Sequence, residues 1–124
     1  MEEINIISGK IISAAIEVHK YLGPGLLESV YEECLCKELE IRSLQVERQK
    51  GLSLVYKDLK LDCGYRMDVL VNALVVIEIK SVEEILPIHK AQLLTYLKLG
   101  NFKLGLLINF NCILLKEGIT RLIN

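Results

Sequence analysis

The period of the hydrophobic residues changes from that of helices to that of strands after about residue 42, and that change restricts the folds open to the chain. From Ile4 to Leu22 apolar residues recur at steps of three and four, which is typical of an amphipathic helix that buries one face. A second helical pattern covers residues 26–42. Gly23-Pro24-Gly25 separates the two patterns. Because glycine accepts a left-handed cap and proline cannot continue a helix, we predict a tight helical hairpin.

After the second helix the pattern becomes that of β-strands, with one return to helix. Residues 65–71 and 74–79 are apolar and β-branched, and with Asn72-Ala73 between them they predict a hairpin at the centre of a sheet. Residues 85–99, with Pro87 in the first turn, predict a helix. The other predicted strands cover residues 45–49, 52–56, 59–61, 104–108, 112–115 and 119–123. The order α-α-β-β-β-β-α-β-β predicts an α/β fold with helices packed on a mixed sheet.

Length, charge and composition limit the domain organisation and the partners. A chain of 124 residues is long enough for one core and too short for two, so we predict a single domain over residues 1–124. The formal net charge of −1 excludes a globally basic nucleic-acid binder, so contact with a polyanion needs a local basic patch or a bound cation. Aromatic residues make up only 6% of the chain, which weakens any mechanism based on a row of stacked bases.

Neither a targeting signal nor a membrane span is expected. The acidic start Met1-Glu2-Glu3 is unlike a secretory signal, and the longest apolar runs are far shorter than the roughly 18 residues that a span needs. The four cysteines, Cys34, Cys36, Cys63 and Cys112, form no CxxC pair. Cys34 and Cys36 point to nearly opposite sides of a helix and cannot share a metal. We therefore expect reduced cysteines in a cytoplasmic protein.

The most informative residues are charged groups inside apolar strands. Asp68 interrupts one predicted central strand, and Glu78 and Lys80 interrupt the next. Because side chains alternate along a strand, Glu78 and Lys80 point to the same side, and a short turn places Asp68 opposite Glu78 or one position away. Burial of such groups is costly unless they are paired or bind a metal. Two carboxylates beside an ammonium suit Mg²⁺ and phosphodiester hydrolysis, whereas the structural alternatives are a buried ion pair or carboxylates at solvated strand ends.

These residues belong to motifs that resemble a known superfamily. Asp68, followed in the next strand by Glu78-Ile79-Lys80, resembles the catalytic signature of the PD-(D/E)XK nucleases. The segment Gly-Leu-Leu-Glu-Ser-Val-Tyr at residues 25–31 matches the GxxExxY motif that names one family within that superfamily. The likeness extends over nearly the whole chain, including residues 19–25, 65–68, 91–97 and 107–111.

The resemblance implies a restriction-endonuclease-like fold, in which a mixed central sheet is flanked by helices, here with an N-terminal helical hairpin. It also implies a site for Mg²⁺ or Mn²⁺. The metal ligands implied are Glu28, Asp68 and Glu78, and the catalytic residues implied are Lys80, Glu78, Asp68 and Gln92. In this scheme Lys80 positions the attacking water and Gln92 is a helical glutamine beside the site. The proline of the "PD" pair is replaced by Met67, a position that varies widely in the superfamily.

The cysteines bear on one further cofactor. Some relatives carry four clustered cysteines that bind an iron–sulfur cluster. The cysteine spacing of this chain does not fit that arrangement, so we expect no iron–sulfur cluster.

Four further residues are expected to support the site: Gly25, Tyr31, His19 and Tyr96. Helical spacing puts Glu28 on one face with Gly25 and with Tyr31 or Glu32, near a turn where backbone can approach closely. Structural alternatives remain open for these residues. Glu28 would complement the helix dipole, Tyr31 and Tyr96 would be packing residues, and His19 would cap the first helix.

Two functions of different classes follow from the sequence. The first is a Mg²⁺-dependent nuclease that hydrolyses DNA with a metal-activated water. The second is a non-catalytic module of the same fold that binds nucleic acid or a protein partner, with a homodimer as one form, since 52% hydrophobic residues leave apolar surface for an interface. A purely structural domain with a buried charge network is a third alternative. The complete set of acids, lysine and glutamine favours the nuclease.

Overall fold

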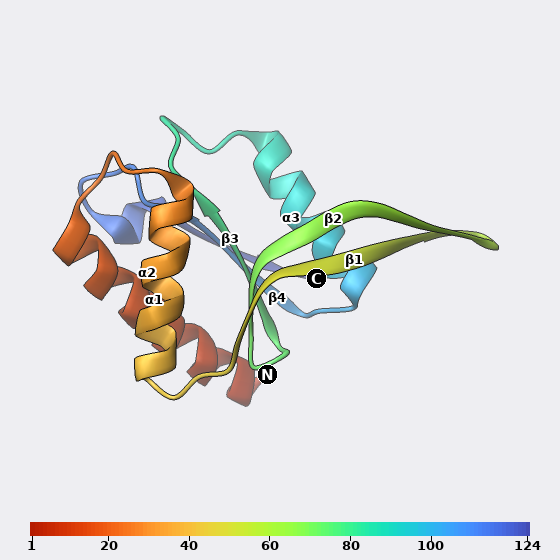
Figure 1. Ribbon diagram of the computed structural model, residues 1–124, viewed down its shortest axis with the longest axis horizontal. Helices are drawn as coiled ribbons and strands as arrows, with labels where there is room; N and C mark the ends of the chain where they lie inside the picture. Colours follow the sequence, from red (N-terminus) through yellow and green to blue (C-terminus); the bar gives the residue numbers. More distant parts are fainter.

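A mixed five-stranded sheet with helices on both faces organises the chain (Figure 1). The computed structural model describes the backbone of residues 1–124 and every side chain except that of Cys63. In chain order the elements are α1 (Glu2–Leu22), α2 (Glu28–Ile41), β1 (Val46–Tyr56), β2 (Leu59–Val71), β3 (Val75–Lys80), α3 (Pro87–Gly100), β4 (Leu104–Asn109), the 3-10 helix η1 (Leu115–Gly118) and β5 (Ile119–Ile123). The predicted α/β class and the N-terminal helical hairpin are confirmed.

The sheet contains one parallel pair of strands, and two of its neighbouring strands, β2 and β3, pair over only part of their length. The strands follow the order β1-β2-β3-β4-β5, with β3 and β4 parallel and every other neighbouring pair antiparallel. Parallel neighbours need a crossover, which α3 supplies. β2 pairs with β3 only from Val71 opposite Val75 to Val69 opposite Ile77. Before Val69, β2 pairs with β1 alone, so the sheet forks at this point.

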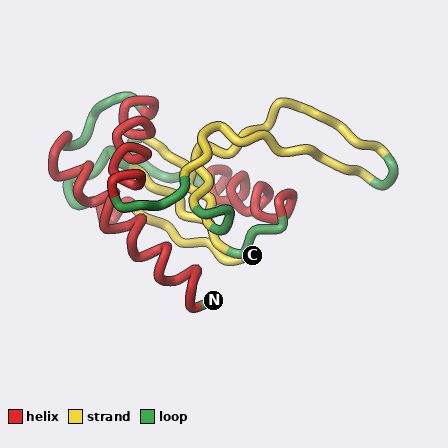
Figure 2. The backbone as a smooth tube through the Cα atoms, turned by 60° about the horizontal axis from the view of Figure 1, so that its bottom comes forward, coloured by secondary structure: helices red, strands yellow, loops and turns green.

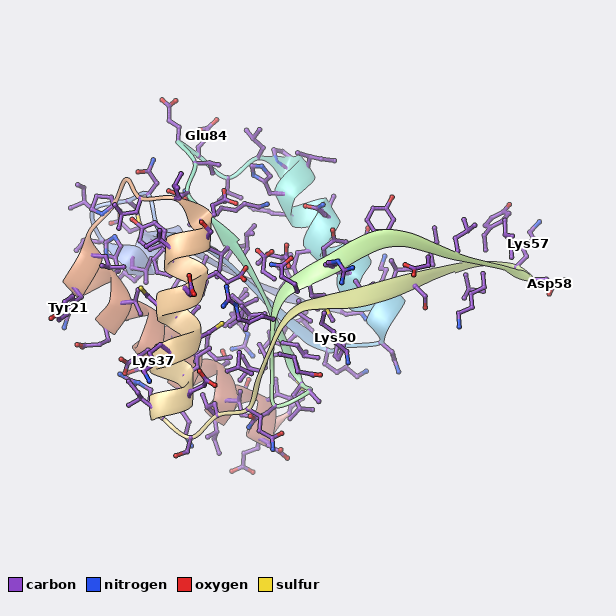
Figure 3. All side chains as sticks on the ribbon, viewed as in Figure 1. Tyr21, Lys37, Lys50, Lys57, Asp58 and Glu84 are labelled. Atoms are coloured by element: carbon purple, nitrogen blue, oxygen red, sulfur yellow. The ribbon has the colours of Figure 1, made fainter. Side chains whose placement is uncertain are left out.

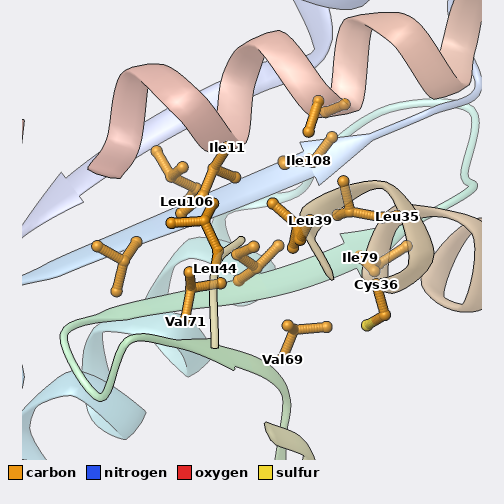
Figure 4. Packing of buried hydrophobic residues seen from close by; sticks show 14 of the residues in the cluster. Ile11, Leu35, Cys36, Leu39, Leu44, Val69, Val71, Ile79, Leu106 and Ile108 are labelled. Atoms are coloured by element: carbon orange, nitrogen blue, oxygen red, sulfur yellow. The ribbon is translucent and has the colours of Figure 1, made fainter. Parts of the chain in front are cut away.

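Each face of the sheet has its own hydrophobic core. The larger core lies between the sheet and the α1–α2 hairpin (Figure 4). Its members include Ile11, Leu35, Val69, Ile79 and Ile108. The smaller core lies between the opposite face and α3. Its members include Leu52, Leu70, Val76, Leu93 and Leu107. Neighbouring residues such as Val69 and Leu70 belong to different cores because strand side chains alternate.

The β1–β2 pair continues far beyond the rest of the sheet. Figures 1 and 2 show it as a two-stranded arm that projects away from the helices and ends in a tight turn. The turn residue Lys57 has a φ of 54°, and Tyr56 pairs with Leu59 across it. A two-stranded ribbon without a third strand is marginally stable in water, so this arm depends on the sheet at its base.

The arm also corrects the predicted number of strands. Residues 45–49 and 52–56 were expected to be separate strands, as were residues 59–61 and 65–71, but each pair is part of one long strand. The predicted break at Lys57-Asp58 is the turn between β1 and β2. The backbone of β1 and β2 stays paired through polar residues, and a pattern of apolar residues cannot reveal strand pairing at those positions. Three strands therefore precede α3, in place of the four in the predicted order.

The predicted strand over residues 112–115 is wrong. β4 already has β3 and β5 as its two neighbours, so no strand partner remains for this run at that edge. Ile113 is 85% exposed and Leu114 is 53% exposed, and the chain turns into η1. The predicted strand over residues 119–123 is confirmed as β5.

The cysteines and helices bear on two further expectations. Cys34, Cys36 and Cys112 are free thiols, and the side chain of Cys63 lies outside the described part of the structure. Within the residues that the structure describes, no helix is both long enough and apolar enough to cross a membrane.

Gly105 in β4 allows α3 to lie close to the sheet. A Cβ at this position would lie 3.0 Å from Cγ of Leu93. We expect Gly105→Val to lower the free energy of unfolding by about 1–3 kcal/mol because it overpacks the smaller core. The matched control is Gly9→Ala in α1, where a Cβ meets nothing within 4 Å. That change should raise the same quantity by about 0.5–1 kcal/mol. Urea unfolding followed by circular dichroism measures both, and a Gly105→Val protein as stable as wild type would contradict this packing.

Candidate active site

Two carboxylates close the fork between β2 and β3. The backbone N–H of Asp68 donates a hydrogen bond to Glu78 Oε2 at 2.8 Å, and the backbone N–H of Ile79 donates one to Asp68 Oδ2 at 2.8 Å. The regular pairing of the two strands ends at Val69 and Ile77, so these two bonds take over where the ladder stops. The structure therefore brings Asp68 and Glu78 together across the fork.

The carboxylate pair is poorly solvated, and its charge is unfavourable. Glu78 is only 5% exposed. Burial, and then the neighbouring charge of Asp68, raise the pKa of Glu78 to about 8. Burial also raises the pKa of Asp68, against the lowering effect of the hydrogen bond from Ile79. Desolvation outweighs the favourable contacts at both residues. At neutral pH the pair consequently holds a proton unless a cation takes its place.

Lys80 lies two residues beyond Glu78 and so points to the same side of β3. Its positive charge lowers the pKa of both Asp68 and Glu78. Lys80 is half-buried, and it makes no ion pair with any side chain that the structure describes. The end of β3 is fixed nearby, because the N–H of Phe110 donates to the carbonyl oxygen of Lys80 at 2.9 Å. The ammonium of Lys80 is thus near Asp68 and Glu78 and forms no salt bridge with a described side chain.

A buried acid that the sequence analysis did not assign to the site approaches Asp68 from α2. Glu32 is 8% exposed and accepts hydrogen bonds from Arg48 Nε at 3.1 Å and from Gln49 Nε2 at 2.9 Å. The same Gln49 nitrogen lies 3.4 Å from Asp68 Oδ1. One amide therefore connects the helix acid to a strand acid.

Backbone conformation explains part of this connection. Gln49 has a φ of 51°, a left-handed value that changes the direction of its side chain within β1. The sequence did carry a signal for Glu32, because helical spacing placed it on the same face as Glu28. No sequence signal marks Gln49, since an interior strand residue with this φ is uncommon.

Glu28 lies at the end of β3 and apart from the carboxylate pair. Its Oε2 accepts a hydrogen bond from the backbone N–H of Ser81 at 3.1 Å, and Ser81 Oγ donates to the carbonyl oxygen of Leu26 at 2.7 Å. Among the described side chains, no group of three or more His, Cys, Asp or Glu residues is arranged to hold a metal. The predicted three-carboxylate cage with Asp68 and Glu78 is therefore not formed, because α2 begins at Glu28 and its carboxylate faces the backbone beyond β3.

Tyr31 fastens the turn between the first two helices. Its hydroxyl donates to the carbonyl oxygen of Gly23 and accepts from the N–H of Leu26 at 3.1 Å. The ring stacks on Phe110, with centroids 4.4 Å apart and planes at 8°. Gly25 has a φ of 93°, which only glycine adopts readily, so the turn needs it. The contacts of the GxxExxY segment are those of a clamp around the site.

His19 and Asn109 hold the chain segments that follow β4 and β3. His19 Nε2 donates to the carbonyl oxygen of Cys112 at 2.8 Å. Asn109, paired with Lys80 in the parallel ladder, donates through Nδ2 to the carbonyl oxygen of Val82 at 3.0 Å and accepts from its N–H at 3.1 Å. Asn109 therefore fixes the chain as it leaves β3. The sequence analysis included it in the resemblance without a role.

α3 contributes a polar pair on the other side of the fork. Gln92 Nε2 donates to the hydroxyl of Tyr96 at 3.1 Å. Burial, and then the charges of Glu78 and Asp68, raise the pKa of Tyr96. Tyr96 is thus within electrostatic range of both carboxylates. Gln92 and Tyr96 are the only two of the sequence-predicted site residues that come from α3.

The arrangement is a carboxylate pair in a sheet fork, a lysine two residues further on that forms no ion pair with a described side chain, and a helical glutamine that donates to Tyr96. A family model described as the PD-(D/E)XK nuclease superfamily matches residues 5–122, which is nearly the entire chain. The chain belongs to the PD-(D/E)XK nuclease superfamily. This confirms the sequence resemblance at the level of the superfamily, while membership of the GxxExxY family stays a prediction. Neither the curated proteins nor the solved structures contain a match to this member of the superfamily.

The raised pKa of Glu78 makes the stability of the metal-free protein depend on pH. The folded pKa of about 8 lies above the ordinary 4.5, so the folded state binds a proton that unfolding releases. We expect the free energy of unfolding to be highest below pH 4.5 for this group and to fall through pH 8, by at most about 1.4 kcal/mol per pH unit. Urea titrations in EDTA across this range measure the effect. Glu78→Gln should flatten it, and a wild-type profile that rises with pH would contradict the assignment.

The buried hydroxyl of Tyr31 should be measurable as stability. Tyr31→Phe leaves the Gly23 carbonyl and the Leu26 N–H without their partner, so we expect a loss of about 1–3 kcal/mol in the free energy of unfolding. Tyr21→Phe is the matched control, because Tyr21 is 87% exposed at the end of α1. Equal effects of the two changes in urea unfolding would exclude the clamp.

Proposed function

We propose that the protein is a Mg²⁺-dependent nuclease that hydrolyses phosphodiester bonds in DNA. The observation that carries the proposal is the fork, where two poorly solvated carboxylates meet beside Lys80 in a chain of a nuclease superfamily. A positive ion is what such a pair lacks, since the pKa of each acid is raised. Functional sites are where such perturbed carboxyl groups gather.

The donor set fits a hard divalent cation. Asp68 Oδ2 and Glu78 Oε2 are engaged by backbone N–H groups. The oxygens that would hold the ion are therefore Glu78 Oε1 and Asp68 Oδ1, the second of which has only the long 3.4 Å contact with Gln49 Nε2. Mg²⁺ keeps several waters and takes one or two carboxylates together with substrate phosphate, which suits two donors better than a closed cage. Mn²⁺ accepts the same oxygen ligands. When bound, the ion would polarise the scissile phosphate and lower the pKa of a water.

The residues of this chain have distinct roles in the proposed reaction. Lys80 donates a hydrogen bond to the attacking water and aims its oxygen at phosphorus. As the new P–O bond forms, the attacking water gives up a proton to solvent, the bond to the leaving oxygen breaks, and that oxygen takes up a proton from solvent. Gln92 and Tyr96 donate hydrogen bonds to the phosphate from α3. Gln49 holds Asp68, and Glu28 holds the backbone beyond Lys80, so both act as positioning residues.

A non-catalytic binding module is the competing function. One observation favours it: the hydrogen bonds of Asp68 and Glu78 already stabilise the fork, so both acids have a structural role without chemistry. Such a module would bind nucleic acid or a protein, as a monomer or as a homodimer. The cleavage experiment below separates the two functions.

The proposed setting is a single-domain enzyme in the cytoplasm. The family match from residue 5 to residue 122 supports one domain. The free thiols of Cys34, Cys36 and Cys112 support a reducing compartment.

Lys80→Ala tests the proposed chemistry. We expect cleavage of DNA by the wild type in Mg²⁺ or Mn²⁺, and a loss of about a hundredfold or more in Lys80→Ala, because a group that positions the nucleophile contributes roughly that much. Lys37→Ala, on the outer side of α2, is the matched control and should cleave as wild type does (Figure 3). Cleavage is followed on labelled DNA, and equal activity of Lys80→Ala and wild type would contradict the assigned site.

Cation binding gives a second readout that needs no turnover. Mg²⁺ should raise the melting temperature of the wild type at neutral pH, because a ligand that binds only the folded state stabilises it. Glu78→Gln should remove that increase. A wild type that neither cleaves DNA nor responds to Mg²⁺ would refute the nuclease and leave the binding module and the purely structural domain as alternatives.

A further inference from the structure

A groove lies between the base of the β1–β2 arm and α3. Its volume is about 430 Å³, which matches a site for one small ligand or one base. Two of its lining residues, Gln92 and Tyr96, also belong to the proposed active site. Because Tyr96 is within electrostatic range of Glu78 and Asp68, the groove lies on the side of the sheet from which the carboxylate fork can be approached.

The arm extends this groove as an amphipathic ribbon. Leu52 is buried beneath α3. The β1–β2 register shifts between Leu52 and Leu54, but Leu54 and Tyr65 line the same groove, and beyond the shift alternation and pairing keep one set of apolar side chains on that face. These are Leu54, Tyr56, Leu59, Leu61 and Tyr65. The opposite face carries polar residues such as Ser53 and Lys60. The apolar face thus continues outward from the groove, beyond the end of α3, without a covering element.

Aromatic rings are concentrated along this path. The chain has five tyrosines, and three of them lie here: Tyr56 near the tip of the arm, Tyr65 at its base and Tyr96 in α3. Tyr56 is 64% exposed and Tyr65 is 45% exposed. The rings of Tyr65 and Tyr96 are 6.4 Å apart. The low aromatic content argued against base stacking, but the fold places three of the seven Phe and Tyr residues along this path.

The charge of the two flanking elements is opposite to that of the remaining chain. Residues 50–66 contain four basic and two acidic residues, and α3 contains two lysines and no acid. Together they carry a formal charge of +4, although the whole chain carries −1. The two acids that precede α3, Glu83 and Glu84, line a different depression, together with Lys90 of α3. The two elements that border the groove therefore carry a net positive charge that favours a phosphate backbone, although Lys60 lies on the opposite face of the arm and Lys50 pairs with Glu47.

We propose that the groove and the apolar face of the arm bind single-stranded DNA, with a base stacked on Tyr65 and the strand directed to the fork. The inference deepens the proposed nuclease function and rests on it for the identity of the polymer. A duplex keeps its base faces inside its own stack, so only an unpaired strand offers them to a tyrosine. The combination of exposed rings with basic residues is the general arrangement of single-strand binding surfaces.

The test measures binding without cleavage. Fluorescence anisotropy in EDTA compares a labelled single strand with its duplex for wild type, Tyr65→Leu and Tyr65→Phe. We expect wild type to prefer the single strand by about tenfold, and Tyr65→Leu to lose about tenfold in affinity for it, while Tyr65→Phe stays within about twofold because the ring is kept. Tyr21→Leu is the matched control, since this exposed residue lies at the opposite end of the molecule from the arm tip at Lys57 (Figure 3).

Three results would overturn the inference. The first is equal or tighter binding of the duplex by wild type. The second is unchanged single-strand binding by a folded Tyr65→Leu protein. The third is light scattering that shows a dimer which Tyr65→Leu dissociates while DNA binding is unchanged, because the apolar face would then be a contact between two copies.

The same measurements separate this inference from the proposed catalysis. Tyr65-dependent binding by a wild type that cleaves nothing would refute the nuclease and retain the single-strand site. Cleavage by wild type without any dependence of binding on Tyr65 would retain the nuclease and refute the single-strand site.

Discussion

Two hydrogen bonds between carboxylates and backbone N–H groups determine the geometry of this protein at its most important point. They join β2 to β3 where the ladder ends, through Asp68 and Glu78. The same bonds fix the two acids within a poorly solvated fork, where the negative charge of both is disfavoured. The structural support of the sheet and the proposed affinity for a cation therefore have one origin. Neither acid can be replaced by an apolar residue without leaving a backbone donor unpaired.

The helix α2 converts this fork into a rigid site. Three of its residues contact different parts of the chain. Glu28 accepts from the backbone N–H of Ser81, and Tyr31 hydrogen-bonds the turn between α1 and α2. Glu32 is connected to Asp68 through the side chain of Gln49. Each contact ties the helix to a strand end or a loop. The GxxExxY segment is consequently a structural clamp as much as a set of chemical groups.

The sequence predicted those features that depend on a regular period. Alternation along two strands was enough to bring Asp68 and Glu78 together, and the helical period gave the N-terminal hairpin. It could not decide between Glu28 and Glu32, because both share a helix face and only packing shows which carboxylate turns inward. Gln49 and the tyrosine-bearing groove were not predictable, since one depends on an unusual φ and the other on residues distant in sequence.

The detachment of the β1–β2 arm has an evolutionary consequence. Among the described side chains of residues 53–65, none belongs to either core. Substitutions on the arm therefore alter few of the contacts that keep the chain folded. Natural selection can vary the length and composition of this ribbon almost independently of the carboxylate fork, so descendants of one ancestor can diverge in what the arm binds while they retain the same fork residues.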